Sequence, residues 1–198
     1  MTPLEHVKKK IYPNLLKAMG FSNTGKVWFK ELKNGIVLFV GYNAKTVKSD
    51  DFSFSVAYGI YFNGVHELLY NNPFEFKYGL ENSIIKTSGN PKRVKSHFFF
   101  TSVTRLEELE IFVQRKVMEE AIPFFESFLV PLDLCDFLES RIEVYKKSDS
   151  IAILKLACIY FLIDQNEQAC SLITSVIEDS KEKYVFAENL FDRINCKG

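Results

Sequence analysis

The sequence has few of the residues that bind metals or act as nucleophiles. It holds three histidines and four cysteines in 198 residues, with no HxH, HExxH or CxxC spacing. Metal sites in sequences are recognised from such spacings, because two ligands on one turn or helix face must reach the same ion. A GxSxG nucleophile motif is also missing. We therefore expect no metal and no cofactor, assign no catalytic residue, and favour a protein that is not an enzyme while leaving the enzyme alternative open.

A surplus of charge and a long apolar run are missing too. The 25 Lys and Arg residues are balanced by 25 Asp and Glu residues. A dedicated nucleic-acid binder needs positive charge to neutralise phosphates, so the balance argues against nucleic acid as the partner. The most apolar segment, residues 151–163, is interrupted by Lys155 and is too short to cross a bilayer. We expect no membrane contact.

The expected compartment is the cytoplasm. The first residues lack the basic start and apolar core of a signal peptide. The cysteines, Cys135, Cys158, Cys170 and Cys196, lie far apart on segments with helical spacing. Their separation predicts buried thiols in a reducing environment.

Aromatic residues are abundant, and they mark the clearest strand in the chain. Aromatic residues make up 15% of the sequence, and 19 of them are Phe. Between residues 52 and 62, bulky side chains alternate with small ones, as in a strand with two different faces. The bulky set is Phe52, Phe54, Val56, Tyr58, Ile60 and Phe62, and the small set is Ser53, Ser55, Ala57 and Gly59.

Further strands and a first helix are predicted on either side of this segment. Thr2 and Glu5 form a capping box for a helix over residues 2–20, in which Pro13 predicts a kink or a second start. Apolar patterns predict strands at 27–32, 36–40, 74–78 and 98–100, with a polar connection at 45–51. Asn-Gly pairs at 34–35 and 63–64 predict tight hairpin turns.

From Thr104 onward the apolar spacing is helical. Thr104 and Glu107 predict a second capping box, and Pro123 a kink or end of that helix. The expected fold is α+β, with an antiparallel sheet of about four or five strands packed against the N-terminal helix and the long following helix. We expect an α+β domain over residues 1–129 and an all-α C-terminal extension, residues 130–198, packed on it.

The front half resembles a bacterial family known as domain of unknown function 4304. The resemblance rests on residues 16–21 (LKAMGF), 28–29 (WF) and 54–60 (FSVAYGI), and on Phe98-Phe99 with Ile-Pro-Phe at 122–124. It covers roughly the first 130 residues. It implies the same helix-then-sheet fold, and it implies no activity and no catalytic residues.

The small-residue face of the long strand is the main candidate binding surface. Ser53, Ser55 and Ala57 allow close approach of whatever covers them. If a helix covers them they are packing residues, which is the alternative we favour. If nothing does, they form the floor of a groove rimmed by Trp28 and Tyr42.

A second candidate surface is basic. Lys92 and Arg93 lie between two predicted strands and close to three consecutive phenylalanines. Basic residues beside exposed rings hold single-stranded nucleic acid. A solvated hairpin loop is the alternative that we favour.

The function expected from these features is a non-enzymatic module that binds another protein or a peptide. One form of it would neutralise a toxin, by analogy with other small bacterial domains. Two alternatives stay open: a hydrolase or transferase site built from distant residues such as Asp51, Ser55 and His66, or weak binding of single-stranded nucleic acid. The oligomeric state is not indicated by the sequence.

Overall fold

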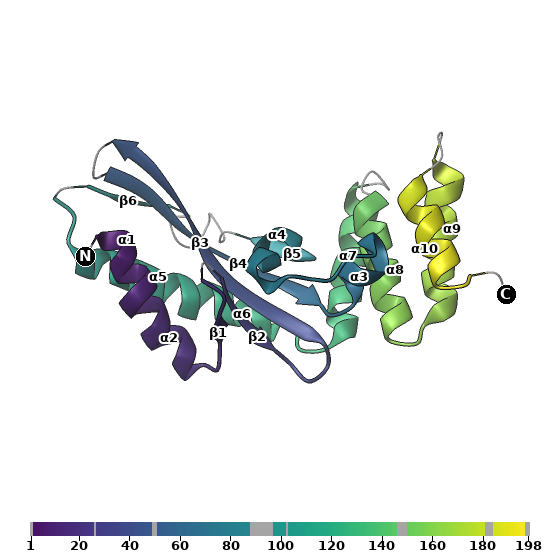
Figure 1. Ribbon diagram of the computed structural model, residues 1–198, viewed down its shortest axis with the longest axis horizontal. Coiled ribbons are helices and arrows are strands. Elements are labelled where there is room, and N and C mark those ends of the chain that lie inside the picture. Colours follow the sequence, from purple (N-terminus) through teal and green to yellow (C-terminus); the bar gives the residue numbers. More distant parts are fainter. Residues whose placement is uncertain are drawn as a thin grey trace. The chain divides into compact units, whose positions relative to one another are not determined.

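The computed structural model describes residues 2–25, 27–48, 51–87, 97–101, 103–145, 150–180 and 184–196. They form an α+β fold with a six-stranded antiparallel sheet in the order β1-β2-β3-β4-β5, in which β6 also pairs with β4 (Figure 1). The expected fold class is confirmed. Contacts divide the chain into two compact units, which we describe separately. The first comprises residues 1–32, 37–61 and 75–127, and the second comprises residues 33–36, 62–74 and 128–198.

The first unit begins with the expected helix. Thr2 and Glu5 form the capping box, since each side chain bonds the backbone N–H of the other residue. The helix is built from α1 (Pro3–His6), the π-helical turn η1 (Val7–Ile11) and α2 (Tyr12–Ala18). Pro13 therefore neither ends the helix nor starts a separate one. The N–H of Tyr12 reaches back five residues to Val7, and this wider turn carries the helix past the proline.

The sheet contains two long strands and four short ones. They are β1 (Ser22–Asn23), β2 (Trp28–Glu31), β3 (Ile36–Lys48), β4 (Asp51–Phe62), β5 (Ile85–Thr87) and β6 (Phe98–Phe100). The predicted strands at 52–62 and 98–100 are confirmed. Asn34 and Gly35 do lie in the turn between β2 and β3, but only Gly35 has a positive φ and pairing stops at Glu31 and Val37, so the turn is not the tight two-residue type. The polar connection expected at 45–51 is wrong, because β3 continues to Lys48. Residues 43–46 are exposed, so this end of the strand needs no alternating apolar residues, and its composition resembles that of a loop.

The strand expected at 74–78 is also wrong. These residues lead into the 3-10 turn η2 (Phe76–Tyr78), and α4 (Gly79–Asn82) comes directly after it. Five alternating residues are too few to separate a strand from a short helix facing the sheet.

Two local signals also have different outcomes from those expected. Asn63-Gly64 does not close a hairpin, because Gly64, with φ of 89°, is the N-cap of α3 (Val65–Tyr70). The capping box at Thr104 is not formed either. The helix begins at Leu106, and the Thr104 hydroxyl instead accepts the backbone N–H of Thr101.

Both faces of the sheet in the first unit are covered. On one face lie the N-terminal helix and the helix built from α5 (Leu106–Arg115), the π-helical turn η3 (Lys116–Ala121) and α6 (Ile122–Glu126). Tyr58 of β4 contacts the ring of Phe125 on α6. On the other face, an added Cβ at Gly79 of α4 would lie only 2.1 Å from the Phe39 ring. Glycine is needed there because the α4 backbone lies against that ring.

A buried ion pair lies beneath the sheet on the helical side. Lys116 is fully buried, and its ammonium donates to the carboxylate of Glu120 at 2.7 Å. The Tyr58 hydroxyl donates to the same carboxylate at 3.4 Å. Burial, reinforced by Glu120, raises the pKa of Tyr58 to about 12, so its hydroxyl keeps its proton at neutral pH.

The second unit is mainly helical. Its C-terminal helices are α7 (Pro131–Tyr145), α8 (Ser150–Leu162), α9 (Asn166–Asp179) and α10 (Val185–Arg193), and α3 packs against α8 and α10. Leu162 of α8 lies against Gly64, where an added Cβ would come within 3.0 Å. The Arg193 guanidinium donates to the Leu68 carbonyl and joins α10 to α3.

The prediction of four buried thiols is half right. Cys135 and Cys158 are buried free thiols, as expected. Cys170 on α9 and Cys196 after α10 instead form a disulfide, with Cα atoms 5.4 Å apart. The two residues are 26 positions apart, and only the packing of α9 against α10 brings them together. Because disulfides persist mainly in oxidising compartments, this bond removes one of the arguments for a cytoplasmic location.

Candidate functional site

A groove of about 430 Å³ lies in the first unit, beside β3. This volume is within the range of natural ligand sites. Seven elements (α1, η1, β3, β4, η2, α4 and β5) and the residue before β2 contribute side chains to it. They are Leu4, Lys8, Val27, Tyr42, Asn43, Ala44, Ala57, Lys77, Tyr78, Leu80, Glu81 and Lys86.

The groove lies where one strand of the sheet ends and its neighbour continues. β2 pairs with β3 only from Trp28, opposite Val40, to Glu31, opposite Val37. β3 runs on to Lys48, so residues 41–48 have no partner strand on that side within the part of the chain that the structure describes (Figure 1). At about 3.3 Å per residue, this open edge is roughly 26 Å long. Val27, Tyr42, Asn43 and Ala44 place the groove at its beginning.

The N-terminal helix forms one wall of the groove. The Tyr12 hydroxyl donates to the carbonyl of Gly41 at 2.9 Å, which ties the helix to β3. Burial raises the pKa of Tyr12 well above its usual value, so this donor stays protonated. The Tyr42 ring stacks on Phe54 at a centroid distance of 5.6 Å, and the Lys8 ammonium lies 5.5 Å from the Tyr42 ring centre. Tyr42 therefore contacts both β4 and the N-terminal helix.

The segment from η2 to α4 forms the opposite wall. It lies close to the sheet because two glycines leave room for it. An added Cβ at Gly59 of β4 would lie 2.5 Å from the Ser83 hydroxyl, and one at Gly79 would meet the Phe39 ring. The Ser83 hydroxyl in turn donates to the Gly79 carbonyl at 2.7 Å. The small face of β4 thus seats a short helical segment, and the groove opens beside it.

The charged side chains in the groove are mostly basic. Lys8, Lys77 and Lys86 line it, against a single carboxylate, Glu81. The Lys77 ammonium lies 2.5 Å from a carboxylate oxygen of Glu75, and this hydrogen bond raises the pKa of Lys77. Lys8 and Lys86 form no ion pair with any residue that the structure describes. The groove therefore offers positive charge beside apolar and aromatic surface.

Of the residues expected to bind on the small face, Tyr42 and Ala57 line the groove. Trp28 and Ser55 are buried, with 4% and 2% of their surface exposed, and do not line the groove. Ala57 is as buried, with 1% exposed, so of the two lining residues only Tyr42 offers its side chain to a ligand. Ser53 is half-buried opposite Phe99 in the pairing of β4 with β6. The small face is therefore largely a packing surface, covered by η2 and α4 rather than by a long helix.

The basic candidates Lys92 and Arg93 lie outside the described residues. The residues that the sequence did not point to are mainly those of the two walls. The helical spacing of the first segment places Lys8 on the solvent-exposed face of its helix, and the alternation at residues 74–78 assigns Lys77 and Tyr78 to a strand. No local signal places these segments on either side of β3, because their positions depend on packing between distant segments.

The structure gives no support to the site proposed from Asp51, Ser55 and His66. At about 3.3 Å per residue, Asp51 and Ser55 are roughly 13 Å apart along β4. His66 belongs to the second unit, where its ring packs against Tyr70 and Phe74.

The free cysteines are poor nucleophiles. Burial raises the pKa of Cys135 and of Cys158 to about 12, so both thiols are protonated at neutral pH. Within the described ranges, no three His, Cys, Asp or Glu side chains gather as a metal site. None of the described helices has the length and apolar character needed to span a bilayer.

No family model, no curated protein and no solved structure matches this chain. The resemblance to domain of unknown function 4304 therefore stays a prediction.

Proposed function

We propose that this chain is a non-enzymatic binding module that holds an extended segment of another protein against the open edge of β3. The observation that carries the proposal is the coincidence of the groove with the point where β2 ends and β3 continues alone. An added strand forms main-chain hydrogen bonds with such an edge, and pockets beside the edge select its side chains.

The walls of the groove suit this role. Tyr42 lines the groove, and Tyr78 on the opposite wall has 46% of its surface exposed. Tyrosine rings provide large contact areas at a small entropy cost, which makes them frequent in binding surfaces. Natural proteins protect free strand edges against pairing, yet here the edge lies beside a groove with apolar residues on its walls.

Peptide selection tests this proposal. A displayed library of random peptides is panned on the immobilised chain, and the affinities of selected peptides are measured by fluorescence anisotropy. A matched pair of variants locates the site. Ala44 on β3 and Ser22 on β1 are both exposed, but only Ala44 lies on the open edge and lines the groove.

We expect Ala44→Trp to fill the groove and weaken peptide binding by about tenfold or more, as when a well-packed contact is lost. Ser22→Trp should leave the affinity within about twofold, because Ser22 lies on β1, outside the groove and outside residues 41–48, and exposed positions outside a site contribute little. A library that yields no binding peptide would contradict the proposal. So would selected peptides that bind both variants as they bind the parent.

A further inference from the structure

We infer that the segment held at the β3 edge is acidic, an inference that rests on the proposed function. The lysines that line the groove come from three separate parts of the fold. Lys8 lies on η1, Lys77 on η2 and Lys86 on β5. Segments distant in sequence thus bring like charges to one groove, against the Glu81 carboxylate in its lining and the Glu75 carboxylate that pairs with Lys77.

Two of these lysines lie over aromatic rings that belong to the groove. The Lys8 ammonium is 5.5 Å from the ring centre of Tyr42, and the Lys77 ammonium is 4.8 Å from that of Tyr78. A cation over a ring is attracted to its face, which favours positions of the charge close to the groove walls. A carboxylate entering between the walls therefore meets the Lys8 ammonium on one side and, on the other, the Lys77 ammonium, which already has Glu75 as a partner.

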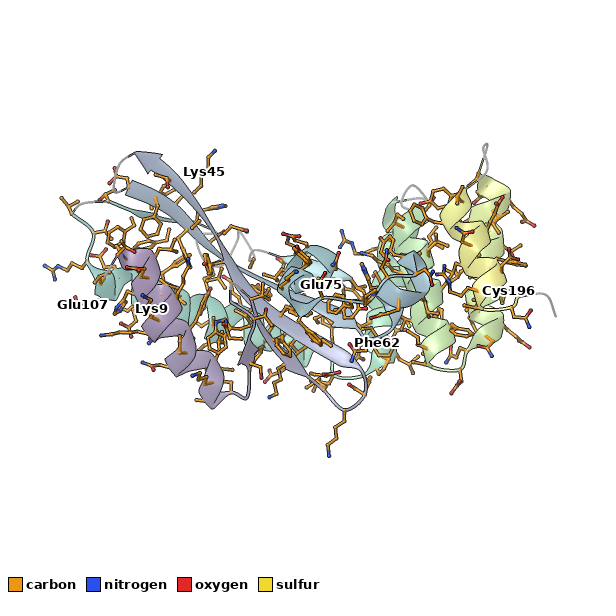
Figure 2. All side chains as sticks on the ribbon, in the orientation of Figure 1. Lys9, Lys45, Phe62, Glu75, Glu107 and Cys196 are labelled. Atoms are coloured by element: carbon orange, nitrogen blue, oxygen red, sulfur yellow. A yellow bond between two sulfur atoms is a disulfide. The ribbon has the colours of Figure 1, made fainter. Side chains whose placement is uncertain are left out.

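The positive charge continues along the open edge beyond the groove. Lys45 is exposed on β3, and Figure 2 shows its side chain pointing away from the ribbon near the far end of the hairpin. A strand added along residues 41–48 would therefore pass Lys8 and Tyr42 first and Lys45 further on. Acidic side chains at intervals along the strand complement this arrangement.

A peptide fits this site better than a nucleic acid. The edge of β3 offers backbone N–H and C=O groups, which another peptide backbone matches in a ladder and a nucleotide chain does not.

Lysines at an exposed strand edge have a different use in many proteins, which is to prevent pairing with other chains. That use predicts no preference between acidic and basic peptides. Binding measurements with peptides of opposite charge therefore separate the two explanations.

The test compares two fluorescein-labelled peptides on one alternating Val-Thr scaffold, with glutamates in one and lysines at the same positions in the other. Binding is measured by anisotropy at low and at high salt. We expect the acidic peptide to bind about tenfold or more tightly at low salt, and the difference to shrink as salt screens the charges. Lys8→Glu should reduce the preference several-fold. Lys10→Glu is the control, because it makes the same charge change on the same helix, is also exposed and does not line the groove.

Each result has a distinct meaning. Equal affinity for both peptides, unchanged by Lys8→Glu, would overturn the acidic specificity while leaving the binding module intact. Binding of neither peptide, together with a library that yields no binder, would overturn the proposed function itself. Tighter binding of a thymidine oligonucleotide than of the acidic peptide, lost in Ala44→Trp, would show that the groove binds nucleic acid and would also overturn the inference.

Discussion

Replacing Gly59 by alanine tests how the small face of β4 positions the groove wall. Gly59 does not belong to the glycines with positive φ, so its backbone accepts alanine without strain. The added Cβ would lie 2.5 Å from the Ser83 hydroxyl, and 2.8 Å from both the Ser83 Cβ and the Ile85 carbonyl oxygen. Ordinary contact begins at 3.4 Å, so these atoms must move away from β4.

The size of the effect depends on which atoms have to move. Ser83 is buried and bonded to the Gly79 carbonyl, and the Ile85 oxygen belongs to the backbone of β5, so neither atom can simply rotate aside. Overpacking of this kind costs about 1–3 kcal/mol. Alanine returns about 0.4–1 kcal/mol by restricting the unfolded chain. We therefore expect the free energy of unfolding of the first unit to fall by about 1–2 kcal/mol.

Urea unfolding followed by tryptophan fluorescence measures this change. Trp28 is the single tryptophan of the chain and is buried in β2, so its emission reports on the first unit. Ser83→Gly in the Gly59→Ala background removes two of the three close contacts and should restore part of the lost stability. A Gly59→Ala variant as stable as the parent would refute the close packing of this segment on β4.

Three further predictions concern buried groups. Lys116→Met should destabilise the first unit by about 3–5 kcal/mol, because it leaves the Glu120 carboxylate buried without the Lys116 ammonium, and Lys116→Met with Glu120→Leu should recover most of this loss in urea unfolding. The pKa of Tyr58 is raised to about 12 in the folded chain, so its contribution to the free energy of unfolding is complete below pH 10 and is lost between pH 10 and 12. Tyr58→Phe should therefore make the free energy of unfolding fall less steeply over that pH range. Cys196→Ser should lower the free energy of unfolding of the second unit by about 3 kcal/mol, as expected for a disulfide that closes a loop of this length, and should leave the unfolding curve reported by Trp28 unchanged. If the parent and the Cys196→Ser variant melt at the same temperature by circular dichroism, this prediction is contradicted.

Local patterns in the sequence predicted the elements that depend on neighbouring residues. The alternation from Phe52 to Phe62 identified β4, and Thr2 with Glu5 identified the first helix start. Both depend on contacts within one strand or one turn. The exposed end of β3 was not predicted, because its residues form no alternating apolar pattern that would mark a strand.

The candidate site was predicted only in part. Tyr42 and Ala57 were expected to bind and do line the groove. The groove itself depends on the difference in length between β2 and β3, and on the fit of Ser83 against Gly59, which lie 24 positions apart in the sequence. The Cys170–Cys196 disulfide is a long-range contact of the same kind. Such contacts are set by tertiary packing, and no local pattern of residues reports on them.

Hydrogen exchange with the acidic peptide bound tests the central claim most directly. If the peptide adds a strand to β3, amide exchange should slow within residues 41–48 in the parent chain, and the effect should be absent in Ala44→Trp. Peptide binding that leaves the exchange of these amides unchanged, or that slows exchange only elsewhere in the chain, would contradict the account.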